Sequence, residues 1–372
     1  MQIDSVVAFA RGVGGLSAKL TRMPTKEFPL VSILIPAFNA EPWICDTIRS
    51  ALAQTWPNKE IIVVDDGSTD RTLALARKFE SDSVTVIAKA NEGAAATRNR
   101  SYLLSKGDYI QWLDADDLLS PDKIERQLAS LRGRDDRYTL LSSAWAPFAH
   151  RPNLAKFVPT SLWHDLAPVE WLVHKMSENL HMQTATWLTS REVADVAGPW
   201  DTRLLVDDDG EYFCRALLAS NGVRFVPESK VFYRRAPSTS RLSYIGMSNG
   251  KMDAMLLSMK LHIQYLRSLE DSPRVRNACL SYLRSWSSTF HPERQDIGVE
   301  LMALASAIGG PIEFPSLRWK YAWLRPILGQ DAAWRIQLVL PEFKANMLFA
   351  LDKLMHYLQR TRRSLPDGRC SH

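Results

Sequence analysis

The sequence has few cysteines and no long apolar run, and each shortage excludes a class of protein. Only four of 372 residues are cysteine, and no two of them are spaced as in a CxxC motif. Such scattered cysteines argue against a disulfide framework or a zinc site and favour reduced thiols in the cytoplasm. No stretch approaches the ~18 apolar residues of a membrane-spanning helix. The amino terminus also lacks the charged start and long apolar centre of a secretory signal, so we expect a cytoplasmic protein.

The sequence also has little excess charge of either sign. Net charge is +5, from 46 basic and 41 acidic residues, and the excess falls largely near the carboxyl terminus. A mild imbalance of this kind does not suggest a nucleic-acid-binding protein. The chain is 46% hydrophobic and 23% charged, as is typical of globular proteins. Its length predicts one large domain with an accessory region.

Four short apolar runs alternate with segments of helical periodicity. We expect strands at residues 31–35, 61–64, 84–88 and 109–113. The helices between them include one with a buried face from Trp43 to Leu52 and one over residues 71–80, capped by Ser68 or Thr69. Strands that are apolar throughout and alternate with helices predict an α/β fold with a parallel sheet covered on both faces.

Polar residues follow three of these strands, at the sheet edge where ligands of such folds bind. The first strand ends in Pro36-Ala37-Phe38-Asn39, the second in Asp65-Asp66, and the fourth in the run 114–117. Phe38 could stack on a base, and the Asp66 carboxylate could accept a hydrogen bond from a base N–H. Arg98, on the helix between the third and fourth strands, could reach a ribose or a phosphate. For Asp65 we favour a capping role instead.

Asp114-Ala115-Asp116-Asp117 is an acidic corner at the exit of the fourth strand. Aspartates two apart in extended backbone point to the same side, so Asp114 and Asp116 can share one hard metal ion or one ion and a sugar. Mg²⁺ or Mn²⁺ held in this way usually bridges to a substrate phosphate. The alternative is a solvated turn that caps the next helix, which we expect to begin at Pro121.

Four segments, in this order, resemble the family 2 glycosyltransferases over roughly residues 30–240. They are VSILIPAFNA, EIIVVDDGSTDRT, NEGAAATRNR and GDYIQWLDADDLLSPDKI. The resemblance implies the GT-A fold, a nucleotide-sugar-binding, Rossmann-like mixed sheet, here with a carboxyl-terminal helical region. It also implies an inverting transfer from a nucleotide-diphospho-sugar, most often a UDP-sugar, with Mn²⁺ or Mg²⁺ as cofactor. The roles that it implies are binding of the nucleotide-sugar by Pro36, Phe38, Asn39, Asp66, Arg98 and Asp114, and binding of the metal by Asp116.

The segment AGPWDTRLLVDDDGEYFCRALL is similar to the family's segment in which two acids open a helix that bears an arginine. The resemblance places these at Asp208, Asp209 and Arg215, with Asp209 as the catalytic base. Two departures blur the register: Asp207 extends the acidic run, and Gly210 stands where the family often has a bulky residue. Asp208 therefore remains an alternative base. We expect Arg215 to act as a structural partner of a nearby acid.

After about residue 245 the pattern becomes helical and, near the end, basic and aromatic. We therefore divide the chain into an extension at 1–28, a GT-A domain at 29–244 and a helical, basic region at 245–372. The basic, aromatic surface could touch an anionic membrane at its inner face, where the acceptor would be a lipid-linked sugar. An ordinary helical subdomain, packed on the sheet or at a homodimer interface, is the alternative. Ser238–Arg241 could form a flap over the diphosphate.

Three other functions fit the sequence less well than a glycosyltransferase. A nucleotidyltransferase would need a Gly-rich, basic loop after the first strand, where this chain has Pro36-Ala37-Phe38-Asn39. A phosphatase with an Asp-x-Asp nucleophile would carry its aspartates after the first strand. A catalytically silent nucleotide-sugar-binding scaffold would lack the acids. The acids are present, at Asp66, Asp114, Asp116 and Asp209, so an enzyme is favoured.

Overall fold

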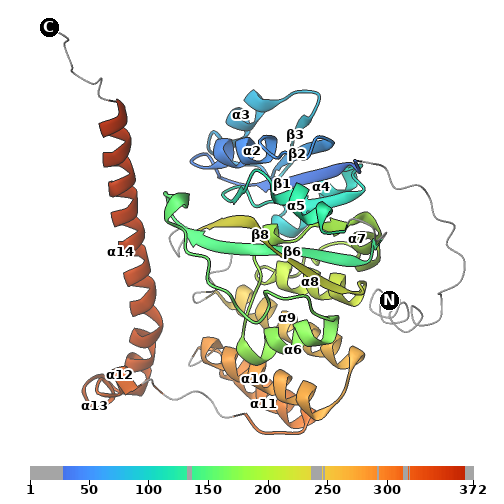
Figure 1. The fold of residues 1–372 in the computed structure, drawn as a ribbon. Coiled ribbons are helices and arrows are strands. Elements are labelled where there is room, and N and C mark those ends of the chain that lie inside the picture. Colours follow the sequence, from blue (N-terminus) through green and yellow to red (C-terminus); the bar gives the residue numbers. More distant parts are fainter. Residues whose placement is uncertain are drawn as a thin grey trace, which may run out of the picture.

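Two sheets make up most of the amino-terminal part of the protein, and helices alone follow them (Figure 1). The structure is a computed structural model that describes residues 28–131, 136–235, 245, 248–290, 293–312, 317 and 319–364. The expected extension and the flap proposed for Ser238–Arg241 lie outside the described residues, apart from Phe28.

The first sheet has the strand order β3-β2-β1-β4-β7. Its strands are β1 (Val31–Ala37), β2 (Lys59–Asp65), β3 (Val84–Ala88), β4 (Tyr109–Trp112) and β7 (Thr189–Ser190). The first four are parallel, as predicted, and β7 pairs antiparallel with β4 at the edge. Ala37 pairs with Asp65, and Asp65 pairs with Ala88, so these three strands end at the same level.

Both faces of this sheet are buried, which explains why its strands are apolar throughout. In β1, Ile33 and Ile35 belong to one hydrophobic cluster, and Leu34 between them belongs to another. Ile44 and Ile48 of α2 pack in the first of these clusters. The helices in this part are α2 (Ile44–Leu52), α3 (Thr72–Ala76), α4 (Ala94–Leu104) and α5 (Lys123–Ala129).

The helix expected over residues 71–80 is shorter than predicted. It is the α-helix Thr72–Ala76 followed by a 3₁₀ turn at Arg77–Phe79, and no side chain caps its N-cap residue, Arg71. The capping roles expected of Ser68, Thr69 and Asp65 are therefore wrong. Asp65 Oδ2 instead accepts a hydrogen bond from Ser68 N at 3.0 Å, so it closes the turn after β2.

A second sheet, which the sequence patterns did not predict as a unit, has the order β5-β8-β6. Its strands are β5 (Leu118–Leu119), β6 (Thr139–Phe148) and β8 (Gly222–Arg234). β6 and β8 are parallel, and the two-residue β5 pairs antiparallel with β8. Because β5 follows the acidic corner directly, this pairing fixes the corner against the end of β8.

Helices complete the rest of the fold. They are α6 (Pro168–Glu178), α7 (Arg191–Ala197), α8 (Asp208–Leu218), α9 (Asn249–Leu269), α10 (Pro273–Phe290) and α11 (Gln295–Ile308). Buried residues of α9, such as Met255 and Leu266, lie in the same cluster as Trp112 of β4 and Trp200. The carboxyl-terminal region is helical, as predicted; the domain boundary at residue 244 stays a prediction.

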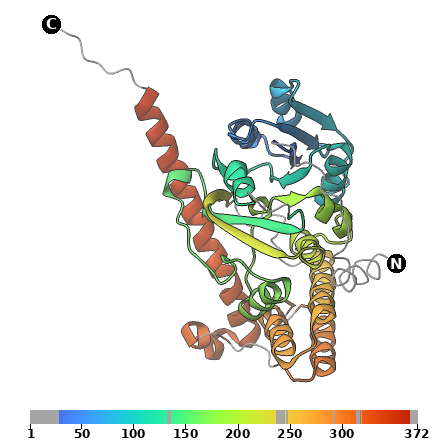
Figure 2. The same ribbon diagram turned by 45° about the vertical axis from the view of Figure 1, so that its right-hand side comes forward.

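The last helices stand apart from this core. α12 (Trp319–Ala322) and α13 (Arg325–Leu328) lie at the foot of α14 (Gln330–Ser364), a single long helix alongside the body (Figures 1 and 2). Within the described part of the chain, no helix is long and apolar enough to span a bilayer.

Candidate active site

The acidic corner follows β4 and contains three aspartates in different surroundings. Asp117 is fully buried, and its Oδ1 accepts a hydrogen bond from Arg234 N at 2.7 Å, while Gln183 Nε2 donates to its Oδ2. Burial and the neighbouring acids raise the pKa of Asp117 well above the ordinary value. Asp117 therefore holds the corner in place, a role that the sequence analysis did not assign to it.

Asp116 is partly exposed and is the least engaged of the three. No other described side chain donates a hydrogen bond to its carboxylate or pairs with it, although Arg234 Nε donates to its main-chain oxygen at 2.7 Å. Burial, followed by the charge of Asp114, raises the pKa of Asp116 to about 7. A bound cation would stabilise the charged form of the Asp116 carboxylate, so these surroundings fit the metal role predicted for it.

Arg98 brings together acids that are far apart in the sequence. Its guanidinium is buried, with Nη1 at 2.5 Å from Asp208 Oδ2 and Nη2 at 2.8 Å from Asp114 Oδ1. Burial disfavours its charge, but Asp208 and Asp114 outweigh this effect and raise the pKa of Arg98. The structure thus places two predicted donor-binding residues and one predicted catalytic residue in a single cluster.

The Trp200 ring packs against the guanidinium of Arg98. It lies 4.4 Å from the Arg98 guanidinium carbon and stacks on Tyr212 of α8 with centroids 4.2 Å apart. Asn99, next to Arg98 on α4, donates to Trp200 O at 2.9 Å and accepts from Trp200 N at 2.7 Å. Trp200 is therefore a buried support rather than a surface for a sugar, as is the buried Trp187.

The two acids that open α8 differ in what they contact. Asp208 is ion-paired with Arg98, whereas Asp209 Oδ2 accepts a hydrogen bond from the neutral hydroxyl of Thr184 at 3.0 Å. Burial is the first cause that raises the pKa of both, to about 6 for Asp208. Of these two acids, Asp209 is therefore the one with which no described cation pairs.

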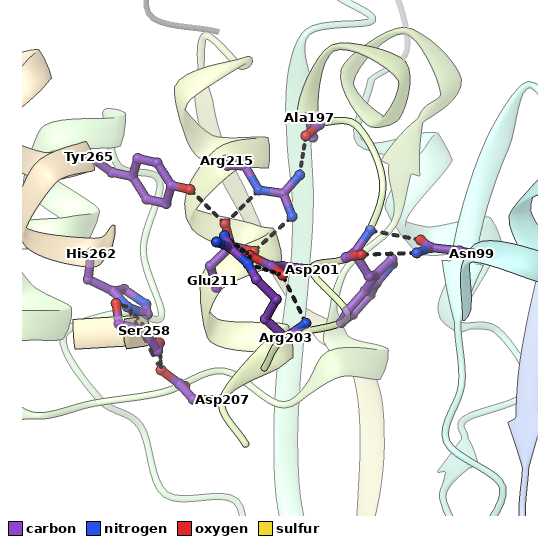
Figure 3. A network of polar contacts seen from close by, with 11 residues as sticks. Asn99, Ala197, Asp201, Arg203, Asp207, Glu211, Arg215, Ser258, His262 and Tyr265 are labelled. Atoms are coloured by element: carbon purple, nitrogen blue, oxygen red, sulfur yellow. Dashed lines mark hydrogen bonds and ion pairs between the residues drawn. The ribbon is translucent and has the colours of Figure 1, made fainter. Parts of the chain in front are cut away.

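Asp207 precedes these acids and has a left-handed backbone, with φ of 55°. Its Oδ2 accepts a hydrogen bond from Ser258 Oγ of α9 at 2.6 Å, and His262 Nδ1 donates to the Ser258 carbonyl at 2.8 Å (Figure 3). A Cβ added at Gly210 would lie 2.2 Å from Asp207 Oδ1. The Asp207 carboxylate therefore occupies the space that a side chain at 210 would need, which explains the glycine.

A second contact joins α8 to its neighbours one turn further on. Arg215 Nε and Nη2 each donate to a different oxygen of Glu211 at 2.7 Å, and Arg215 Nη1 donates to Ala197 O at the end of α7 (Figure 3). Tyr265 of α9 donates to Glu211 Oε1 at 2.7 Å. Arg215 is thus a structural partner of an acid, as predicted. α9 contacts α8 and the residue before it at two places, through Ser258 and through Tyr265.

The predicted base pocket lies at the ends of β1 and β2. The Phe38 side chain is 50% exposed, which leaves its ring free to meet a ligand. Pro36 is half-buried and pairs with Val64. Asn39, with φ of 47°, accepts from Thr69 N at 2.8 Å, while its own N–H donates to Ser68 Oγ at 3.0 Å. Asn39 ties the two loops together, and its role at the ligand stays a prediction.

Asp66 is buried at the same edge, and its carboxylate already accepts three hydrogen bonds. Its Oδ1 accepts from Glu92 N at 3.0 Å and from Lys89 Nζ, and its Oδ2 accepts from Gly93 N at 2.9 Å. A carboxylate offers about four acceptor positions, so one remains on Oδ2 for a base N–H. Asp66 and Lys89 also fix the turn that starts α4, the helix of Arg98.

Arg234, the last residue of β8, holds the acidic corner in a way that the sequence did not predict. Besides its contacts with Asp116 and Asp117, it donates to Ala149 O at 2.8 Å, and its guanidinium carbon lies 4.3 Å from the Trp43 ring. It follows Tyr233 directly at the carboxyl end of β8. That position in the sequence was the signal that could have found it.

Residues 32–144 match the sequence profile described as "Glycosyl transferase family 2". They include β1 to β4, Arg98 and the whole acidic corner. Over these residues, here called the family 2 domain, the chain is similar to family 2 glycosyltransferases. The expected resemblance is confirmed.

Two bacterial proteins illustrate what the family 2 domain is similar to. An uncharacterized glycosyltransferase of Rickettsia typhi is 43% identical over 130 residues, which cover 35% of this chain and 41% of that protein. TuaG of Bacillus subtilis, named as a teichuronic acid biosynthesis glycosyltransferase, is 36% identical over 136 residues, covering 34% of this chain and 54% of TuaG. The chain thus spans about half the length of these relatives, or less.

The likeness of folds extends beyond the family 2 domain. The crystal structure of S. aureus TarS 1–349 in complex with UDP superposes with a TM-score of 0.56 over 85% of this chain and 91% of that chain, at 17% sequence identity. The protein therefore has the GT-A type of fold that the resemblance implied, with a mixed, largely parallel sheet.

Proposed function

We propose that the protein is a glycosyltransferase that moves a sugar from a nucleotide-diphospho-sugar to an acceptor hydroxyl with inversion. The observation that carries this proposal is the convergence of Asp114, Arg98 and Asp208 in one cluster beside Asp209, inside a family 2 fold. The names of TuaG and of a 39% identical E. coli relative, chondroitin synthase, support a setting in polysaccharide or glycoconjugate assembly.

Asp209 is the proposed base. It would take the proton of the acceptor hydroxyl while that oxygen attacks the anomeric carbon from the side opposite the diphosphate. The bond from the anomeric carbon to the phosphate oxygen breaks, and its electron pair leaves with the nucleoside diphosphate. Thr184 orients Asp209 through its 3.0 Å hydrogen bond, and Arg98 holds Asp208 and Asp114 beside the reacting sugar.

Phe38 and Asp66 would bind the base of the donor, and Asp114 its ribose or sugar. The TarS structures contain UDP and UDP-GlcNAc, which supports a UDP-sugar as donor here. Pro36 and Asn39 would shape the pocket through the backbone of the β1 loop.

Asp116 would hold Mn²⁺ or Mg²⁺. Among the described residues, no three His, Cys, Asp or Glu side chains are grouped so as to hold a metal ion by themselves. The unpaired Asp116 carboxylate therefore fits an ion whose other ligands come from the donor diphosphate and water, the arrangement that Mg²⁺ commonly adopts. Such an ion would offset charge on the leaving diphosphate.

We place this reaction in the cytoplasm with a sugar or a lipid-linked sugar as acceptor. The described cysteines, Cys45, Cys214 and Cys279, are unpaired thiols, which suits a reducing compartment. Membrane contact through the carboxyl-terminal helices and homodimerisation belong to the same proposal, and no binding to nucleic acid is expected.

The test is calorimetric titration of UDP, GDP and dTDP, each with Mn²⁺ and with EDTA. Asp116→Asn is compared with wild type and with Asp122→Asn, which removes an acid ion-paired to Arg126 outside the corner. We expect metal-dependent binding of one nucleotide that is lost in Asp116→Asn only. If the folded protein binds no nucleotide under either condition, the donor site is wrong and a scaffold function takes its place.

A further inference from the structure

α14 carries an apolar stripe that the rest of the described chain leaves exposed. Six of its large side chains are half exposed or nearly so and recur every three or four residues: Leu340 (49%), Phe343 (67%), Met347 (50%), Leu351 (51%), Leu354 (53%) and Leu358 (46%). Residues at these steps lie on one side of a helix. α14 is therefore an amphipathic helix with its apolar side in solvent.

The contacts of α14 with the body come from its other side. Phe349 packs on His150 with ring centroids 4.9 Å apart, and Asp352 accepts from Arg151 Nε at 2.7 Å. With 3.6 residues per turn, Phe349 and Asp352 lie roughly opposite Met347 and Leu354. The stripe thus lies on the side of α14 opposite these two contacts, where its side chains are exposed.

The charge of this part of the chain differs from that of the rest. Residues 318–363 contain nine Lys and Arg and three Asp and Glu, a net charge of +6, whereas residues 1–317 contain 36 and 37, a net charge of −1. Lys344 is exposed at one edge of the stripe, next to Leu351 in projection, whereas the exposed Lys353 lies beyond the other edge, toward Phe349. Two tryptophans at the foot of the helix, Trp319 and Trp323, are 87% and 62% exposed.

We propose that the stripe on α14 binds the surface of an anionic lipid bilayer, with the helix lying in the plane of the interface. The apolar side chains would enter the boundary between headgroups and acyl chains, and Lys344 and Lys353 would meet anionic headgroups. Exposed tryptophans suit the same boundary.

A second copy of the chain fits this face less well. Pairing two such stripes would bring together two segments of net charge +6, which repel each other. Paired helices usually place opposite charges beside their apolar seam. Here the exposed residue at the edge of the stripe, Lys344, is basic, as is Lys353 beyond the other edge, and the acid Asp352 is already paired with Arg151.

The same helix contacts the surroundings of the acidic corner. His150, which Phe349 touches, also packs on Trp43 with centroids 5.2 Å apart, and Trp43 lies under the Arg234 guanidinium that binds Asp116 O. Binding through α14 would therefore hold the corner near the bilayer. That geometry suits an acceptor carried by a lipid, an extension that rests on the proposed function.

The test is co-sedimentation of the full chain with vesicles of phosphatidylcholine alone or mixed with phosphatidylglycerol. The variant Phe343→Ser/Leu351→Ser removes the centre of the stripe. The control, Val299→Ser/Met302→Ser, removes side chains that are 63% and 45% exposed on α11. We expect binding to anionic vesicles that weakens with salt, falls at least about tenfold in the stripe variant and is unchanged in the control.

A second variant, Lys344→Glu/Lys353→Glu, keeps the stripe and should weaken binding to anionic vesicles only. Light scattering without lipid gives the oligomeric state of each protein. The proposal is overturned if folded wild type binds neither kind of vesicle. It is also overturned if wild type is a dimer that the stripe variant converts to monomers without any change in vesicle binding. Nucleotide binding, measured separately, should be the same in wild type and in all three variants, so failure here leaves the donor site untouched.

Discussion

Asp208 and Asp209 are neighbours in the chain, but among the residues that the structure describes a cation pairs with Asp208 and none with Asp209. A base must be able to take up a proton, and the Arg98 guanidinium 2.5 Å from Asp208 opposes this. We predict that Asp209→Asn lowers kcat by about 10²- to 10⁴-fold and leaves the affinity for the donor nucleotide unchanged. Initial rates and calorimetry on the same preparations measure the two quantities.

Asp208→Asn is the matched comparison, because it also removes one carboxylate from the first turn of α8. It should lower kcat less than Asp209→Asn and weaken donor binding, since it frees Arg98 to pair with Asp114 alone. The opposite order of the two kcat values would assign the base to Asp208.

The surroundings of Asp209 also predict how activity depends on pH. Burial and then the charge of Asp207 raise its pKa above the ordinary 3.8, while Arg98 opposes the shift. Asp114 adds to it, and Thr184 opposes it. The base is active when deprotonated, so kcat should be complete above the raised pKa and fall as pH drops through it.

Asp207→Asn tests this cause. Asparagine tolerates a left-handed backbone and still accepts a hydrogen bond from Ser258, but it carries no charge. The acid limb of the profile of kcat against pH should therefore move to lower pH in this variant. An unmoved limb would show that Asp207 does not act on the titrating group.

Ser258 lies outside the family 2 domain and yet reaches the residue before the two acids. Ser258→Ala removes the 2.6 Å hydrogen bond to Asp207 and should lower kcat about three- to tenfold, with donor affinity unchanged. Ser268→Ala is the control, because the one described partner of its hydroxyl is the Tyr265 carbonyl of the same helix. Equal kcat in both variants would show that Ser258 does not help to position the acids.

At the scale of elements, the buried Glu211–Arg215 pair connects α7, α8 and α9. Removing one partner of a buried pair leaves an uncompensated charge and costs about 3–5 kcal/mol. We predict a loss of this size for Arg215→Met in urea unfolding, against about 1 kcal/mol for Tyr265→Phe, which removes one hydrogen bond and no charge. Equal losses would mean that the pair is not the main link between these helices.

The elements differ in how far the sequence predicts them. The strands β1 to β4 are apolar runs bounded by turns, so their pattern is local and readable. β5 has two residues, and its pairing with β8 joins Leu118 to Phe232, more than a hundred residues away. A contact of that kind leaves no periodic signal, and the second sheet could not be predicted from pattern alone.

The whole molecule shows the same division between local and distant features. Resemblance gave the fold and pointed to Asp114, Asp116, Asp208 and Asp209, because those residues stand in short, ordered motifs, but it assigned no role to Asp117. It did not give the connections between them: Arg98 was assigned to the nucleotide, and its pairing with Asp114 and Asp208 depends on how α4 and α8 pack. Asp207 made the alignment of the two acids ambiguous in the sequence. Its contact with Ser258 depends on how α9 packs against α8.

The molecule also divides into a body and an appended group of helices, α12 to α14. Tyr321, Leu324 and Ala333 form a small cluster of their own, while the two large clusters of the body end at Ile312. The contacts between the two parts include the Arg151–Asp352 ion pair and the packing of Phe349 on His150. Partly exposed contacts of this kind contribute about 1 kcal/mol each at most.

We therefore predict that a chain ending at Ile312 folds and keeps its midpoint of thermal unfolding within about 5 °C of the full chain. Its nucleotide binding should remain, because Phe38, Asp66 and Asp116 all lie in the body, whereas vesicle binding should be lost. Calorimetric scans and nucleotide titrations of both chains test this. An unfolded or aggregated truncated protein would show that α14 belongs to the body's fold, and its apolar stripe would then need another explanation.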